Sequence, residues 1–283
     1  MRSCILDPST CPTTIDFGPQ YASNKTAQEI LTHVNQCLQF HGRNKIKKFQ
    51  IFFCPLDEFL TDIENWVAFA VANGVEELKL DFSMGFDYSE EEFTNGGKSF
   101  KLPNILFQCK TLTHLSLSHC DFCPPANFSG FDTLCSLSLT YVSITAEKLQ
   151  HCISNSPSLE CLSLKNCKNL ESIIVTSKQL RRLNIVNSLW EASHIEITAP
   201  KLESFIYHGT HIFGDLLGYH PYDPFIDISS LSDVFISSIG TEAEHEHDFI
   251  KLLYDLRKVK VLTVCTATLM VILFKLLNSF KYY

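Results

Sequence analysis

An α/β solenoid of stacked parallel strands is the fold class that the sequence predicts, from an internal repeat and from helical periodicity between its copies. Two stretches, LTHLSLSHC at 112–120 and LECLSLKNC at 159–167, share a frame in which positions one, four and six are apolar. The frame recurs in IKKFQI, VEELKL, LCSLSL, LRRLNI and LESFIY, and more weakly in LSDVFI and VKVLTV. Repetition on this scale indicates a stacked repeat architecture.

Each copy of the frame has the alternation expected of a half-buried strand. Positions four and six point to the same side of a strand, and stacking many copies in parallel buries that side continuously. The full frame, L-x-x-L-x-L-x-x-N/C, matches a leucine-rich repeat to its ninth position. We predict a leucine-rich-repeat solenoid with strands on the concave face and helices or short back-side strands on the convex face. The predicted structural repeat positions are Leu115, Leu117, Cys120, Leu137, Leu139, Leu162, Leu164 and Cys167.

The segments between the frames indicate how the chain returns from one strand to the next. The copies that begin at 159, 180 and 202 have a regular front spacing if 170–175 and 192–197 are back-side strands. Apolar residues at helical spacing predict helices over 26–41, 57–73, 145–153 and 246–259, and a terminal helix with an apolar face from Leu269 to Phe280. Residues 1–45 are predicted to form a linker and a capping helix, and residues 46–283 the solenoid with a C-terminal helical cap.

Composition and charge restrict the partners and the compartment. The chain has 45% hydrophobic residues and a net charge of −8, which argues against nucleic acid and against an anionic membrane surface. The uncharged run at 261–274 is shorter than the ~18 residues of a membrane span, so a buried helix is favoured over a tail anchor. No secretory signal precedes the twelve dispersed cysteines. Reduced thiols and an intracellular location, cytoplasmic or nuclear, are expected.

Two clusters could suggest metal chemistry. In HCDFC, Cys120 and Cys123 stand beside His119, but zinc requires four ligands and the sequence has no second CxxC. In EHEHDF, residues 244–249, acidic residues suit a helix start and the histidines suit an exposed loop, with a weak metal contact as the alternative. No phosphate-binding loop or Ser/His/Asp signature is present. We therefore predict no cofactor, no metal site and no catalytic residue.

The side chains between the buried positions of each strand should point to the concave side. Most are small and polar, and no acid and base converge at one level, which suits a binding face better than a catalytic one. The candidate binding face comprises Glu77, Lys79, Asp81, His114, Ser116, Ser118, Ser136, Ser138, Thr140, Cys161, Ser163, Lys165, Arg182, Asn184, Ser204 and His208, with Val186 and Ile206 between them.

Residues 66–82, 102–120, 155–167 and 197–209 together resemble the repeat region of plant F-box/LRR proteins, including those with an FBD segment. The resemblance implies repeats that select a protein for ubiquitination, while an amino-terminal F-box docks on a Skp-type adaptor. The chain starts directly at what resembles the linker after an F-box, so Skp-type adaptor binding is not expected for this chain.

A protein-recognition module that binds an unidentified protein target, and is not an enzyme, is the resulting hypothesis. Three alternatives remain. One is a truncated or non-functional family member, another is a carbohydrate-active enzyme on a parallel β-helix, and the third is a small-molecule pocket on the concave side.

Overall fold

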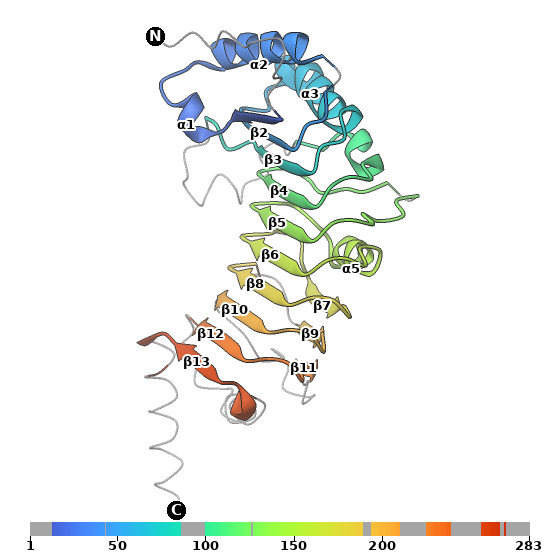
Figure 1. Cartoon of the computed structure of the whole chain (residues 1–283). Helices are drawn as coiled ribbons and strands as arrows, with labels where there is room; N and C mark the ends of the chain where they lie inside the picture. The colour runs from blue at the N-terminus through green and yellow to red at the C-terminus, as the bar shows by residue number, and fades with distance from the viewer. Residues whose placement is uncertain are drawn as a thin grey trace, which may run out of the picture. The chain divides into compact units, whose positions relative to one another are not determined.

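The computed structural model describes residues 13–42, 44–85, 100–125, 127–188, 194–209, 225–238, 256–266 and 269. The chain divides into two compact units, Met1–Leu134 and Cys135–Tyr283. In each unit, parallel strands form a sheet and the return segments form a second layer behind it (Figure 1). The predicted α/β leucine-rich-repeat fold is thereby confirmed.

The first unit holds four neighbouring parallel strands, in the order β1-β2-β3-β4. Its elements are β1 (Thr14–Phe17), α1 (Pro19–Ala22), α2 (Ala27–His41), β2 (Lys48–Phe52), η1 (Asp57–Phe59), α3 (Leu60–Ala72), β3 (Glu77–Asp81), η2 (Asn104–Gln108) and β4 (His114–Ser118). The inward side chains stack in two register rows, Ile15, Phe49, Leu78 and Leu115 in one and Phe17, Ile51, Leu80 and Leu117 in the other. All eight are buried, as the frame predicts for β2 to β4.

Strand β1 lies outside the repeat frame, which begins only at Ile46. The segment TIDF is four residues long, yet Ile15 and Phe17 alternate with polar residues and complete the two buried rows. The first strand of the sheet therefore lies ahead of the first copy of the frame.

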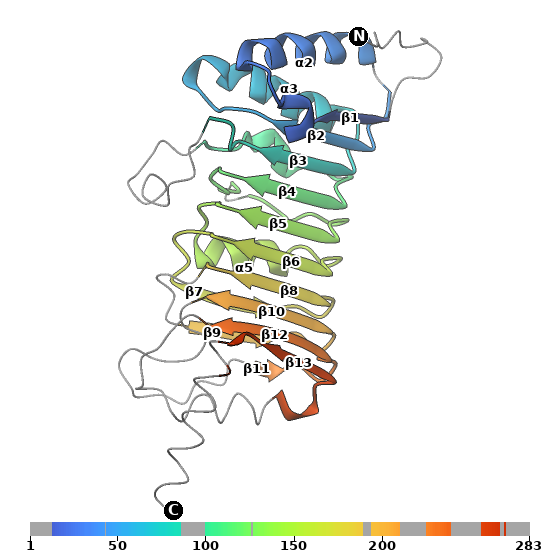
Figure 2. The same cartoon turned by 90° about the vertical axis from the view of Figure 1, so that its left-hand side faces the viewer.

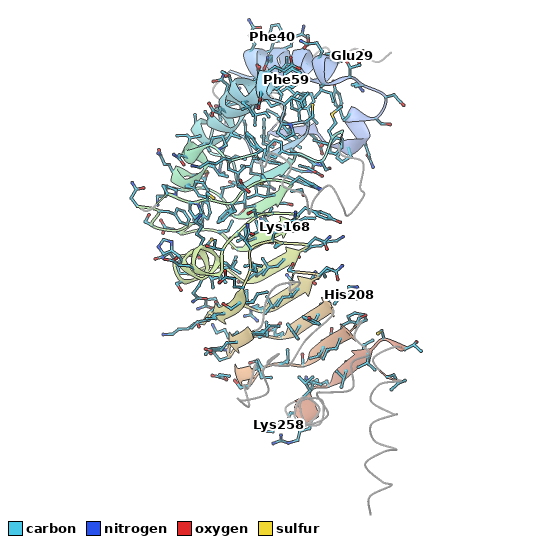
Figure 3. The ribbon with its side chains drawn as sticks, turned by 180° about the vertical axis from the view of Figure 1, so that it is seen from behind. Glu29, Phe40, Phe59, Lys168, His208 and Lys258 are labelled. Carbon is cyan, nitrogen blue, oxygen red and sulfur yellow. The ribbon has the colours of Figure 1, made fainter. Side chains whose placement is uncertain are left out.

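Helices form the second layer of the first unit. The predicted helix 26–41 is α2, and Thr26 caps it in a reciprocal capping box with Glu29. The predicted helix 57–73 is a 3-10 turn, η1, followed by α3. Trp66 of α3 is buried at 1% exposure, packs edge-on against Phe53 with ring centroids 5.0 Å apart, and donates from Nε1 to Asn35 Oδ1 of α2 at 2.7 Å. Figure 3 marks Phe40 on the outer surface of α2 and Phe59 further inside.

The second unit holds six neighbouring parallel strands of the front sheet, and a three-stranded back sheet. The front order is β5 (Ser136–Thr140), β6 (Cys161–Lys165), β8 (Arg182–Val186), β10 (Ser204–Gly209), β12 (Asp233–Ser238) and β13 (Val261–Val264). The back sheet joins β7 (Ser172–Thr176), β9 (His194–Thr198) and β11 (Phe225–Asp227), while α5 (Ala146–Ser154) and η3 (Leu256–Lys258) complete the unit.

The back sheet confirms the prediction that 170–175 and 192–197 return as strands. Ile173 pairs with Ile195 and Val175 with Ile197, and all four are buried against the front layer. Earlier in the unit the return segment is the helix α5, which Thr145 caps by accepting a hydrogen bond from the Lys148 N–H. Helical return segments, here and in α3, distinguish this fold from a parallel β-helix, whose coils consist of strands.

The structure describes only part of the C-terminal segment for which a strand and helices are predicted. The weak frame VKVLTV forms β13, paired with β12, but Leu262 is 38% exposed whereas Val234, its register partner, is fully buried. Among the described strands β13 has a neighbour on one side only, so its apolar face is less covered. Most of the helix predicted at 246–259, and nearly all of that from Leu269 to Phe280, lie outside the described residues. Within the described ranges, no helix combines the length and apolar character needed to cross a membrane.

A chain of main-chain hydrogen bonds links successive repeats at position two of the frame. In the second unit the Cys135 carbonyl accepts from the N–H groups of both Glu160 and Cys161, each at 2.9 Å. The Glu160 carbonyl accepts in the same way from Arg181 and Arg182, and the pattern continues to Val261. The first unit repeats it from Thr13 to His114. Two main-chain hydrogen bonds thus join each repeat to its neighbour just before the strand begins.

At position eight, where four strands end, the backbone turns into the left-handed region. The φ angles are 57° at His119, 52° at Tyr141, 50° at Asn166 and 46° at Asn187. The Asn166 N–H donates to the Val186 carbonyl at 2.8 Å, so the turn also extends the ladder by one bond. Asparagine tolerates this conformation better than most residues, which accounts for its presence at two of these ends.

We expect Asn166→Ala to lower the free energy of unfolding by about 1 kcal/mol, because an alanine side chain crowds the backbone at positive φ. Asn166→Gly removes the same amide without that cost and should change stability by less than about 0.5 kcal/mol. Urea unfolding followed by circular dichroism measures both. Equal losses would show that the amide, not the backbone conformation, matters at this turn.

Candidate recognition face

The first unit carries six of the predicted face residues on β3 and β4. Register pairing places Glu77 beside His114, Lys79 beside Ser116 and Asp81 beside Ser118. Five of them are exposed or half-buried, while Ser118 is buried at 9% exposure. The structure therefore brings these six side chains together on the side of the sheet opposite its buried rows.

Asp81 has the most structured environment of the six. Its Oδ1 accepts from the Ser83 N–H at 3.1 Å and lies 4.0 Å from Nδ1 of His119. Burial lowers the pKa of His119 below its usual value, and the Asp81 carboxylate opposes that shift. His119, considered in the sequence as a zinc ligand, therefore stands beside a carboxylate at the end of β4.

Strands β1 and β2 extend this face beyond the predicted residues. Asp16 and Gln50 share a register row with Lys79, and Lys48 shares one with Glu77. Lys48 Nζ lies 3.2 Å from Asp16 Oδ2, so charges of opposite sign alternate across the surface. The copy of the frame that begins at Ile46 places Lys48 and Gln50 at outward positions. Asp16 lies on β1, which is outside the frame.

The second unit arranges the other predicted residues in three rows that cross β5, β6, β8 and β10. One row contains Ser136, Cys161, Arg182 and Ser204, the next Ser138, Ser163, Asn184 and Ile206, and the third Thr140, Lys165, Val186 and His208. Figure 2 looks onto this face, with β6, β8 and β10 in front of α5 and β7. Figure 3 shows His208 projecting from β10.

Side-chain contacts within the rows run from one strand to the next. Arg182 Nε donates to Cys161 Sγ at 3.1 Å, and Asn184 Nδ2 donates to Ser163 Oγ at 3.3 Å. The Asn184 Oδ1 atom is buried, and it accepts no hydrogen bond from the residues that the structure describes. These contacts link the outward side chains of neighbouring strands to one another.

The rows continue onto β12 with two residues that the sequence analysis left out. Asp233 follows Ser204, and Phe235 follows Ile206 in the middle row. Asp233 is exposed and Phe235 half-buried. The weak frame LSDVFI places both at outward positions, so the same alternation that gave the other face residues applied to them.

The two cysteines at position nine lie under the strand ends. Cys120 is 1% exposed and Cys167 3%. Cys167 Sγ lies 3.5 Å from the Leu139 carbonyl oxygen, and its N–H donates to Ser188 Oγ at 3.1 Å. Burial raises the pKa of Cys167 to about 11, so its thiol keeps the proton that it can donate.

We expect Cys167 to resist maleimide labelling at pH 8. With a pKa of about 11, only about one thiol in a thousand is ionised at that pH, and the side chain is buried. The half-buried Cys161 provides the comparison within the same unit. Peptide mass spectrometry would locate the label, and equal modification of both cysteines in the native chain would contradict the packing described for Cys167.

The outward side chains of both units are mostly polar. Their hydroxyl, amide and charged groups are spread along register rows, and each row offers hydrogen bonds at strand spacing. In the part of the chain that the structure describes, no three His, Cys, Asp or Glu side chains are grouped to hold a metal ion.

A family model and several known proteins are similar in sequence to this chain. A family model described as the LRR domain of At1g61320/AtMIF1 matches residues 37–218. The F-box/FBD/LRR-repeat protein At1g13570 of Arabidopsis thaliana is 37% identical over 119 residues, which are 42% of this chain and 25% of that protein. A protein named as an F-box/LRR-repeat protein, At5g54820, also from Arabidopsis thaliana, is 28% identical over 255 residues, or 89% of this chain and 53% of its own length.

The FBD-associated F-box protein At1g61320 of Arabidopsis thaliana is 23% identical over 206 residues, covering 72% of this chain and 42% of that protein. The chain therefore spans about half the length of these relatives or less. No solved structure matches it significantly.

Proposed function

Because the chain belongs to the leucine-rich-repeat family described by the At1g61320/AtMIF1 domain, we propose that it is a non-enzymatic protein-recognition module. In this proposal the outward side chains of the parallel strands form the binding face. The observation that carries the proposal is the set of register rows in which Ser, Thr, Asn and a few charged side chains repeat from strand to strand.

The physical support comes from where the backbone and the core place these groups. The inward positions fill the apolar core and the ladder satisfies the main chain, so the outward positions are not needed for folding. Such a surface can vary its side chains while the scaffold stays the same, as in other repeat proteins that bind along a concave sheet.

The bound molecule in this proposal is a protein of the kind that a ubiquitin-ligase receptor selects. The names of the relatives join the same repeats to an F-box, and that association supports the suggestion. The proposed compartment is the cytoplasm or the nucleus, because the twelve cysteines are dispersed along a long chain, as is usual for proteins whose thiols stay reduced.

A pair of matched variants tests the proposal. Ser163→Arg places a long cation in the middle row of the front sheet, and Ser172→Arg makes the same change at a half-buried position on the back sheet. Each variant and the unaltered chain would be used to capture proteins from an Arabidopsis extract, after circular dichroism has shown that all three are folded.

We expect Ser163→Arg to abolish capture of at least one protein that the unaltered chain and Ser172→Arg both retain. Quantitative mass spectrometry of the captured proteins provides the measurement. If the two variants retain the same proteins, or lose the same ones, binding does not use the front sheet and the proposal fails.

A further inference from the structure

We draw no further inference here: the strongest candidate, the apolar surface patch that the exposed side chains of Val261 and Leu262 form at strand β13, carries none because nothing in the structure shows what covers it.

Discussion

Leu164→Asp is expected to unfold the second unit, whereas Ser163→Asp, one residue away, leaves it folded. Leu164 is completely buried in the row that joins Leu139 and Ile185, so an aspartate there has no partner for its charge. An unpaired buried charge costs several kcal/mol, comparable to the ~5–15 kcal/mol that stabilises a whole domain. Ser163 points to the other side of the same strand, where its hydroxyl meets Asn184.

Circular dichroism during thermal unfolding measures both variants. The corresponding pair in the first unit, Leu117→Asp and Ser116→Asp, repeats the test in the other unit, because Leu117 is also fully buried and Ser116 only half-buried. Similar melting temperatures within either pair would mean that the strand register is wrong there.

The second large effect is expected for Trp66→Ala, which should lower the free energy of unfolding by about 3–5 kcal/mol. The indole fills the space between α3 and the aromatic cluster at Phe53, and its N–H ties α3 to Asn35 of α2. Truncation leaves a cavity in the layer that covers β2 and β3. Chemical denaturation followed by circular dichroism provides the measurement.

Two controls separate the contributions at Trp66. Phe40→Ala truncates an aromatic residue that is 77% exposed on α2, and it should change stability by less than about 0.5 kcal/mol. Trp66→Phe keeps most of the ring but loses the bond to Asn35, so an intermediate loss of about 1 kcal/mol is expected. A loss for Phe40→Ala as large as that for Trp66→Ala would contradict the packing assigned to α3.

The sequence was sufficient to predict most of the strands, because a period-two alternation inside a repeat of fixed frame marks both a strand and its buried side. It was not sufficient for β1, since TIDF is too short to show the frame and lacks an apolar residue at position one. The left-handed turns were also missed. The repeat frame marks position nine by its cysteines. The backbone adopts a positive φ one residue earlier, at Asn166 and the equivalent residues of other repeats.

The candidate face was predictable as a set of outward positions but not as a set of contacts. That Arg182 reaches Cys161, or that Ile206 stands beside Phe235, depends on the register between strands that are about 20 to 30 residues apart in the chain. Alternation within one strand says which way a side chain points, whereas its neighbours are set by how the return segments align successive strands. Return segments as different as α5 and β7 give the same alignment here.

The main-chain hydrogen bonds at position two of the frame allow the side chain at that position to vary during evolution. Because the link uses a carbonyl and two N–H groups, the side chain at that position is free to be Cys135, Glu160, Arg181, Glu203 or Ser232. Proline is the exception at the two donating positions, since it has no N–H to give. Substitutions can therefore accumulate at position two without loosening the stack, while a proline there would separate one repeat from the next.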